Sequence, residues 1–189
     1  MYTTISGLLL AAGAGRRYGM PKALVERDGR LLVEHGLATL QTAGCSPVVV
    51  VLGAAAETVL ARAELPGALA VTSPDWREGM GASLRVGLDA LAGTDAQAVV
   101  VLLVDTPGVT ASAVRRVSAH SSTDALVVAT YHGERGHPVL LGRSHWPGVA
   151  AAAVGDVGAR PYLRKHRGRL LTVACEDIAD GTDLDRPDR

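Results

Sequence analysis

The feature that most constrains the fold is an apolar run near the start of the chain that ends in a glycine-rich, basic turn. Residues 8–24 read LLLAAGAGRRYGMPKAL. A continuous apolar run of this kind is typical of a buried parallel strand. Three glycines let the backbone bend and approach a ligand closely: Gly13, Gly15 and Gly19. Backbone amides in such a turn bind anions. Three cations add charge: Arg16, Arg17 and Lys22. The sequence therefore predicts a site for the triphosphate of a nucleotide, although the turn has neither a GxxxxGK[ST] nor a complete GxGxxG pattern.

The composition limits the classes of protein to which the chain can belong. Its 189 residues favour a single domain with a substantial core. A formal net charge of +0 argues against a nucleic-acid partner held by bulk electrostatics, and 3% aromatic residues leave few side chains to stack on bases. No apolar run is long enough for a transmembrane helix, so no membrane partner is expected. Cys45 and Cys175 stand alone, which argues against a zinc site or a disulfide framework and fits a cytoplasmic protein.

Apolar, valine-rich segments alternate with segments of helical periodicity. We expect strands at Ile5–Ala12, Pro47–Leu52, Ala68–Thr72, Ala98–Val104, Leu126–Thr130 and Leu170–Ala174. We expect helices at Leu31–Thr42, Ala54–Arg62, Ala82–Leu91, Ala111–His120, Ser144–Ala153 and Ala159–His166. This alternation predicts an α/β fold: a single Rossmann-like three-layer domain, with a mostly parallel sheet and helices on both faces. Ligands bind at the carboxyl ends of the strands in such sheets, so loops 13–22 and 73–81 and Asp105 should meet there.

Two of the segments that follow strands carry candidate ligand-binding side chains. Asp105 ends the run VVVLLVDTP at the tip of a central strand, where a carboxylate can hold Mg²⁺ together with phosphate oxygens. The alternative is a helix cap or an Asx turn, because Thr-Pro-Gly follows; the position beside the glycine turn favours the metal role. Ser83 lies in the first helical turn of SPDWREGMGASLRVGLDAL (residues 73–91), where anions bind, and its alternative role is a local cap.

The second half of the chain contains weaker candidates. His137 lies in YHGERGHPVLL, where Gly133 and Gly136 flank an expected hairpin turn, and a contact to an acceptor substrate suits it better than catalysis. GDVGAR (residues 155–160) pairs Asp156 with Arg160, whose alternative roles are a cap and an exposed charge. No Ser/His/Asp or Cys/His set can be assembled, so covalent catalysis is not indicated. The polar tail after Ile178 is either frayed or folded back.

These residues resemble the small nucleotidyltransferases of molybdenum cofactor biosynthesis, and within them the molybdenum cofactor cytidylyltransferase branch. LAAGAGRRYGMPK (residues 10–22) is similar to the family's LAAGxGxRxGxxK signature, and GMGASLRVGL (79–88) to its serine-glycine segment. VDTP (104–107) stands where the family has a GDMP-like metal motif, with Val and Thr replacing Gly and Met. GHPVLL (136–141) and GDVGAR (155–160) resemble the part that faces the acceptor, and DLDRP (183–187) resembles a DxDTP ending.

The resemblance implies a nucleotide-diphospho-sugar transferase-like fold in which residues 1–110 mainly bind nucleotide and metal and residues 120–170 mainly bind the acceptor. It implies these nucleotide-binding residues: Leu10, Ala11, Ala12, Gly13, Gly15, Arg17, Lys22 and Ser83. Its catalytic set is Arg17, Lys22 and Asp105, with Mg²⁺ held by Asp105 and Asp183, or by Asp185 in place of Asp183. The acceptor set is His137, Asp156 and Arg160. Ala12 before Gly13 resembles the form that uses CTP.

The implied reaction is an in-line transfer of CMP from CTP to a phosphate oxygen of the molybdenum cofactor, with release of pyrophosphate. Such a transfer depends on positioning and charge stabilisation and requires no nucleophilic side chain. A molybdoenzyme or its maturation chaperone is a further partner that the resemblance suggests. The rival interpretations are a sugar- or polyol-phosphate nucleotidyltransferase, a non-catalytic carrier of the molybdenum cofactor, and a nucleotide-sensing module.

Overall fold

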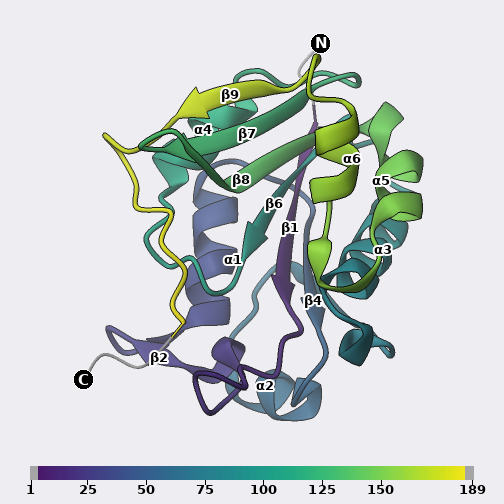
Figure 1. The fold of residues 1–189 in the computed structure, drawn as a ribbon. Helices are drawn as coiled ribbons and strands as arrows, with labels where there is room; N and C mark the ends of the chain where they lie inside the picture. Colours follow the sequence, from purple (N-terminus) through teal and green to yellow (C-terminus); the bar gives the residue numbers. More distant parts are fainter. Residues whose placement is uncertain (1–3, 186–189) are drawn as a thin grey trace.

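A seven-stranded sheet runs through residues 4–185, the part of the chain that the computed structural model describes (Figure 1). The strand order is β5-β4-β1-β6-β8-β7-β9. Strands β5, β4, β1 and β6 are parallel to one another, and β7 is parallel to β9, whereas β8 is antiparallel to both β6 and β7. The strands are β1 (Ile5–Ala11), β4 (Val48–Leu52), β5 (Ala68–Thr72), β6 (Ala98–Leu103), β7 (Leu126–Tyr131), β8 (Glu134–Gly142) and β9 (Leu171–Ala174). A small antiparallel ribbon pairs β2 (Glu26–Arg27) with β3 (Arg30–Leu31).

Helices cover both faces of the sheet, which gives the predicted three layers (Figure 1). One face carries α1 (Leu32–Thr42), α2 (Ala56–Arg62) and α4 (Ala111–Ser118). The other carries α3 (Met80–Leu91), α5 (Trp146–Ala152) and α6 (Arg160–Lys165). Among residues 4–185, no helix has both the length and the apolar character needed to cross a bilayer.

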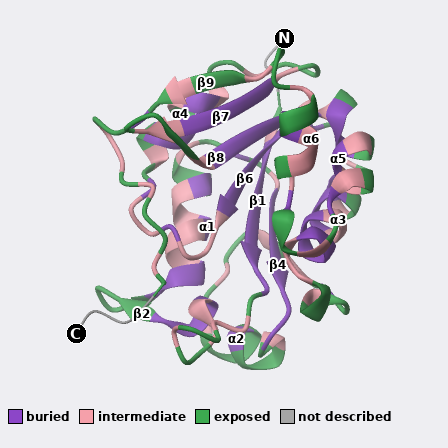
Figure 2. Cartoon of the chain, in the orientation of Figure 1, coloured by how far each residue is buried: buried purple, intermediate pink, exposed green. Residues whose placement is uncertain are grey.

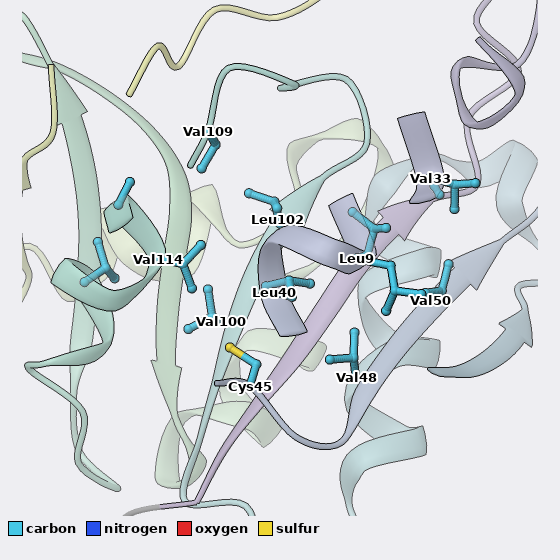
Figure 3. Packing of buried hydrophobic residues seen from close by; sticks show 14 of the residues in the cluster. Leu9, Val33, Leu40, Cys45, Val48, Val50, Val100, Leu102, Val109 and Val114 are labelled. Carbon is cyan, nitrogen blue, oxygen red and sulfur yellow. The ribbon is translucent and has the colours of Figure 1, made fainter. Parts of the chain in front are cut away.

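The two-sided cover explains why the strands are apolar at every position rather than at alternate ones. All five residues of β4 are buried, and successive residues point to opposite faces (Figure 2). Leu9 and Val100 pack toward α1 and α4, with Leu40 of α1 against them (Figure 3). Leu8 and Val101 face the second core, which contains residues of α3 and α5. The sheet is therefore the buried central layer of the domain, and the loops that follow its strands lie at its edges.

The strands and helices expected from the sequence are confirmed to within a few residues, but β8 was missed. The expected hairpin exists: its turn lies at His132–Gly133, where both residues have positive φ. Gly136, however, lies inside β8 opposite Ala129, rather than at the end of the turn. Glycine and proline within Glu134–Gly142 weaken the strand signal, and a bulge between Val128 and Ala129 absorbs the irregularity.

The reversed direction of β8 matters for the position of the site. Because β8 runs against β6, its first residues lie beside the carboxyl end of β6. Val139 is the partner of Val101, so His137 lies beyond it toward that edge. The carboxyl edge of the sheet thus collects residues from the turn after β1, from the loop after β6 and from the start of β8.

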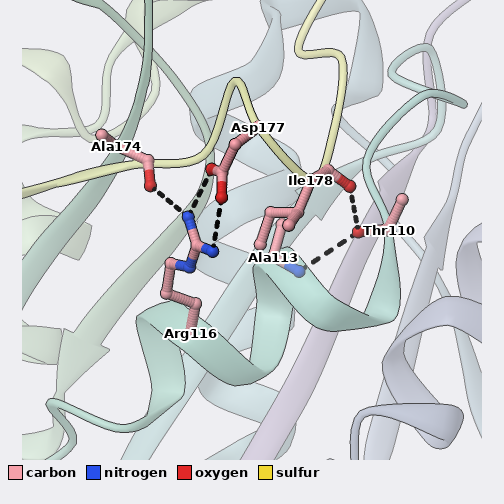
Figure 4. A network of polar contacts seen from close by, with 6 residues as sticks. All are labelled: Thr110, Ala113, Arg116, Ala174, Asp177 and Ile178. Carbon is pink, nitrogen blue, oxygen red and sulfur yellow. Dashed lines mark hydrogen bonds and ion pairs between the residues drawn. The ribbon is translucent and has the colours of Figure 1, made fainter.

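The chain end folds back along the molecule. After β9, residues 175–185, which we call the strap, run down past α4 toward the carboxyl edge of the sheet (Figure 1). Thr110 joins the strap to α4, because its hydroxyl accepts a hydrogen bond from the amide of Ala113 at 3.2 Å and donates one to the carbonyl of Ile178 at 3.0 Å (Figure 4).

We expect Thr110→Ala to lower the free energy of unfolding by about 1 kcal/mol, because it removes the cap of α4. Thr110→Ser keeps the hydroxyl and should be close to the wild type. Urea unfolding followed by circular dichroism measures both. Equal losses in the two variants would show that the methyl group, and not the hydroxyl, supplies the stability.

Candidate active site

The turn after β1 closes tightly on itself. The amide of Gly19 donates a hydrogen bond to the carbonyl of Gly15 at 2.8 Å, and Gly15 has a φ of 60°. A Cβ on Gly15 would collide with the carbonyl oxygen of Met20, so the turn requires glycine there. The turn ends in a 3-10 helix, Lys22–Leu24, which places Lys22 beside the end of β6.

A cavity of about 360 Å³ lies between this turn, the start of α3 and the end of β6. The turn and the end of β1 contribute Leu10, Ala12, Gly13, Ala14, Gly15, Arg16 and Lys22. The loop before α3 and the helix itself contribute Trp76, Arg77, Gly79, Met80 and Ser83. The remaining wall consists of Leu103, Val104, Asp105 and Asp156. Three segments that the sequence predicted to meet at one sheet edge therefore enclose one cavity.

Lys22 and Asp105 form the charged centre of the cavity. The Nζ of Lys22 lies 2.9 Å from Oδ2 of Asp105 and 3.6 Å from Oδ1 of Asp185. The side chain of Lys22 is only 14% exposed, so this ammonium group is held in place and largely out of bulk water. The other carboxylate oxygen of Asp105, Oδ1, is buried and has no hydrogen-bond partner among residues 4–185. A buried anionic oxygen without a partner is unfavourable unless a cation or a donor binds to it.

Asp183 reaches the same centre from the strap. The amide of Leu184 donates a hydrogen bond to the carbonyl of Asp105 at 2.7 Å, which fixes the strap against the end of β6. Burial, together with the negative charges of Asp105 and Asp185, raises the pKa of the Asp183 carboxyl, while Lys22 and Arg160 oppose this effect. Several carboxylates therefore repel one another around a single lysine, and an additional cation would relieve that repulsion.

The carboxylates present fit a divalent cation whose remaining coordination positions are filled by the substrate and by water. Within residues 4–185, no three His, Cys, Asp or Glu side chains are grouped closely enough to hold an ion without other ligands. Mg²⁺ commonly takes one or two carboxylates and fills its remaining positions with water and phosphate oxygens. The free Oδ1 of Asp105 and the nearby carboxylate of Asp183 match that requirement.

His137, at the start of β8, is a neutral group close enough to Asp105 and Arg160 to feel their charges. Burial lowers the pKa of its imidazole to about 4; the charge of Asp105 opposes this shift and that of Arg160 adds to it. The phenol of Tyr131 donates a hydrogen bond to the carbonyl of His137 at 2.7 Å, which fixes the backbone at this position. At neutral pH this imidazole can donate and accept hydrogen bonds without adding charge.

We expect His137 to make the protein less stable as the pH falls from about 6.5 to about 4. Its pKa is lower in the folded state, so the unfolded chain binds more protons in this range and the free energy of unfolding rises with pH. The shift corresponds to at most roughly 3 kcal/mol, and partial exposure of the ring reduces the expected effect to about 1–2 kcal/mol. His137→Asn should flatten the dependence in urea unfolding at pH 5 and 7. His120→Asn, at an exposed site, is the control, and identical slopes in all three proteins would contradict the assignment.

Comparison with known proteins identifies the family. Residues 7–170 match the model of the MobA-like NTP transferase domain. The chain belongs to the MobA-like NTP transferase family. Members of this family are nucleotidyltransferases, and the glycine turn of this chain lines the cavity described above.

Relatives of this MobA-like transferase carry different names. The chain is 40% identical to nicotine blue oxidoreductase of Paenarthrobacter nicotinovorans over 96% of its own length and 92% of that protein. It is 33% identical to the bifunctional protein GlmU of Streptomyces avermitilis over 79% of its own length, but spans only 32% of GlmU. The crystal structure of Rv0371c from Mycobacterium tuberculosis has a TM-score of 0.83 at 32% identity, covering 98% of this chain and 94% of that one. A further structure is described as Rv0371c in complex with manganese, with a TM-score of 0.77 at 28% identity over 91% of this chain and 88% of that one.

The structure of the transferase brings together most of the residues expected from the sequence. Seven of them line the cavity: Leu10, Ala12, Gly13, Gly15, Lys22, Ser83 and Asp105. Asp183 is not part of the wall, but it precedes Leu184, whose amide binds the carbonyl of Asp105. Asp156 also lines the cavity, while His137 and Arg160 lie close enough to influence the same charged groups. Ala11 is buried within β1 rather than in the cavity wall. Arg17 is exposed and is not part of the wall, whereas its neighbour Arg16 is.

Sequence reasoning missed the aromatic wall of the cavity. Trp76 lines it, and the guanidinium of Arg77 lies 4.6 Å from the centre of the Trp76 ring. Gly53 permits this arrangement, because a Cβ there would lie 2.5 Å from the Cβ of Trp76. The sequence did contain a signal for this wall. Trp76 is one of two tryptophans in the chain, and it lies in the loop 73–81, which was expected at the ligand-binding edge.

Proposed function

We propose that this protein transfers CMP from CTP to a phosphorylated acceptor, the molybdenum cofactor, and releases pyrophosphate. The observation that carries the proposal is the pairing of Lys22 with Asp105 in the wall of a glycine-lined cavity. The second carboxylate oxygen of Asp105 is buried and has no partner among the described residues. That combination suits a metal-bound triphosphate, because it offers a cation to phosphate oxygens and a carboxylate oxygen to a metal ion. The preference for CTP rests on Ala12 before Gly13, and the choice of acceptor on the family resemblance.

The reaction balances without a covalent enzyme intermediate. A phosphate oxygen of the acceptor forms a bond to the α-phosphorus of CTP, and the bond from that phosphorus to the bridging oxygen breaks as pyrophosphate leaves. Amides of the turn around Gly13 and Gly15 bind the phosphates, and Lys22 stabilises charge at the α-phosphate. Arg17 serves the β- and γ-phosphates, with Arg16 as a second candidate because it lines the cavity. Ser83 contributes its hydroxyl from the first turn of α3.

Asp105 and Asp183 would hold Mg²⁺. When bound, the ion neutralises phosphate charge and polarises the phosphoryl group. The manganese complex of Rv0371c supports a divalent cation in a related fold. Lys22 separates Asp105 from Asp185, so Asp185 acts as a partner of the lysine in this arrangement, and Asp183 is the better second ligand.

The acceptor side consists of His137, Asp156 and Arg160. Arg160 lies near His137 and Asp183, so its guanidinium can bind the phosphate of the acceptor where it must approach the α-phosphate. His137 is neutral and can hydrogen-bond to the acceptor without attracting or repelling its charge. We place the reaction in the cytoplasm, with a molybdoenzyme or its chaperone as the partner that receives the product.

The deciding experiment measures pyrophosphate release with Mg²⁺ and CTP, GTP, ATP or UTP, with and without molybdenum cofactor. We expect release with CTP that depends on the cofactor. Release with a sugar or polyol phosphate instead would move the acceptor to that class. Binding of CTP without release under any condition would favour a carrier or a sensing module.

A second candidate is an oxidoreductase, which the 40% identity to nicotine blue oxidoreductase favours. Its direct test is bleaching of nicotine blue with NADH or NADPH as the hydride donor. A glycine turn could bind the pyrophosphate of such a dinucleotide as well. Hydride transfer, however, needs neither Lys22 nor the free oxygen of Asp105. Bleaching that persists in Asp105→Ala, without any nucleotidyl transfer by the wild type, would therefore replace the first proposal.

A further inference from the structure

The strap supplies part of the charged centre, although it contains no helix or strand that would fix its position. Asp183 and Asp185 lie about ten residues beyond the end of β9, in a segment without regular secondary structure. A free segment from Asp177 to Asp183 could extend over roughly 20 Å, so it could place Asp183 at many positions far from Asp105. Contacts outside the cavity must therefore restrict the position of Asp183.

The first restraint is an arginine on α4. Arg116 donates two hydrogen bonds to the carboxylate of Asp177, at 2.6 and 2.9 Å, and one to the carbonyl of Ala174 at 2.8 Å (Figure 4). The planar guanidinium thus holds the end of β9 and the first turn of the strap at the same time. Bidentate pairs of this kind fix orientation as well as distance.

The remaining restraints follow along the strap toward the cavity. The hydroxyl of Thr110 binds the carbonyl of Ile178, and the amide of Asp180 donates to the carbonyl of Gly108 at 3.0 Å. Gly108 has to be glycine for this approach, because a Cβ would lie 2.6 Å from the carbonyl oxygen of Asp180. The last restraint is the hydrogen bond from the amide of Leu184 to the carbonyl of Asp105. Each restraint lies on α4 or on the loop between β6 and α4, the loop that also carries Asp105.

We propose that Arg116 and Asp177 are positioning residues, which hold the strap so that the Asp183 carboxylate stays beside Asp105 and the two share a divalent cation. The proposal rests on the proposed function, since it assumes that this pair of carboxylates binds the cation. Arg116 and Asp177 do not line the cavity and act only through the strap. Their loss frees the first part of the strap and lowers the fraction of time that Asp183 spends in place.

The test uses the full-length protein and Mn²⁺ as the probe. Electron paramagnetic resonance measures free Mn²⁺, and pyrophosphate release is followed as a function of Mn²⁺ concentration with CTP and molybdenum cofactor. We expect Arg116→Ala and Asp177→Ala each to weaken Mn²⁺ binding about tenfold, as is common when a group that orients a ligand is removed. Saturating Mn²⁺ should restore most of the rate in both. Arg115→Ala is the matched control, because Arg115 lies on the same helix but donates to Thr42 and Ser112 and not to the strap.

The double variant Arg116→Ala/Asp177→Ala tests whether the two residues act as a unit. We expect it to bind Mn²⁺ no more weakly than the weaker single variant, because all three lack the same contact. Wild-type affinity in both single variants, or losses that add in the double variant, would overturn the positioning role. A lowered melting temperature with unchanged Mn²⁺ affinity would assign the pair a structural role only. If the wild type neither binds Mn²⁺ nor releases pyrophosphate, the proposed function is wrong, and the positioning role, which depends on it, is wrong as well.

Discussion

Replacing Asp105 with alanine should reduce pyrophosphate release by about 10²–10³-fold, because it removes the carboxylate that we assign to the metal ion. The fold should persist. The side chain of Asp105 is partly exposed, and one of its two oxygens has no partner within residues 4–185 that could be lost. Asp105→Asn is the sharper variant, since its amide preserves the shape of the side chain but not its charge. Pyrophosphate release and thermal unfolding monitored by circular dichroism measure the two effects separately.

Asp89→Ala provides the control for Asp105. Asp89 is exposed on α3 and is not part of the cavity wall, so its removal changes the total charge equally without altering the site. We expect wild-type turnover in this variant. Near-normal turnover in Asp105→Asn would contradict the metal assignment and would leave only the hydrogen bond to Lys22 as the role of Asp105.

The sequence was sufficient to predict features that depend on local pattern. The apolar runs of β1, β4 and β6 are buried on both faces, which is the environment that such runs indicate. The position of Asp105 followed from the rule that strand ends collect ligands, and that rule requires only the strand boundary. The direction of β8 could not be predicted. Gly136 and Pro138 weaken the sequence pattern of this strand, and its register is determined by its pairing with β6 and β7.

The sequence could not predict the positions of side chains whose neighbours in the structure are distant in sequence. The family signature favours Arg17 over its neighbour Arg16, and only the path of the turn decides that Arg16 lines the cavity. From the sequence, the strap could have been either frayed or folded back onto the domain. Its position depends on Arg116, Thr110 and Gly108, which lie about 60 to 80 residues before it and show no pattern that links them to it.

Replacing Lys22 should also reduce pyrophosphate release by about 10²–10³-fold, but for a reason that separates it from Asp105. Lys22→Met keeps most of the buried aliphatic stem and removes the charge that we place at the α-phosphate. In the folded protein this ammonium group neutralises Asp105 and Asp185. Without it, the carboxylates attract a cation more strongly, so Mn²⁺ should bind at least as tightly as in the wild type while turnover is lost.

The chain provides its own control, because it contains only one other lysine, Lys165, which is exposed on α6. Lys165→Met should leave both turnover and Mn²⁺ affinity unchanged. Parallel losses of metal binding and turnover in Lys22→Met would mean that the lysine organises the carboxylates rather than the phosphate. Unchanged turnover in that variant would remove Lys22 from the reaction. Tight Mn²⁺ binding without turnover would instead separate the two functions of the centre, with carboxylates that hold the cation and a lysine that acts on the nucleotide.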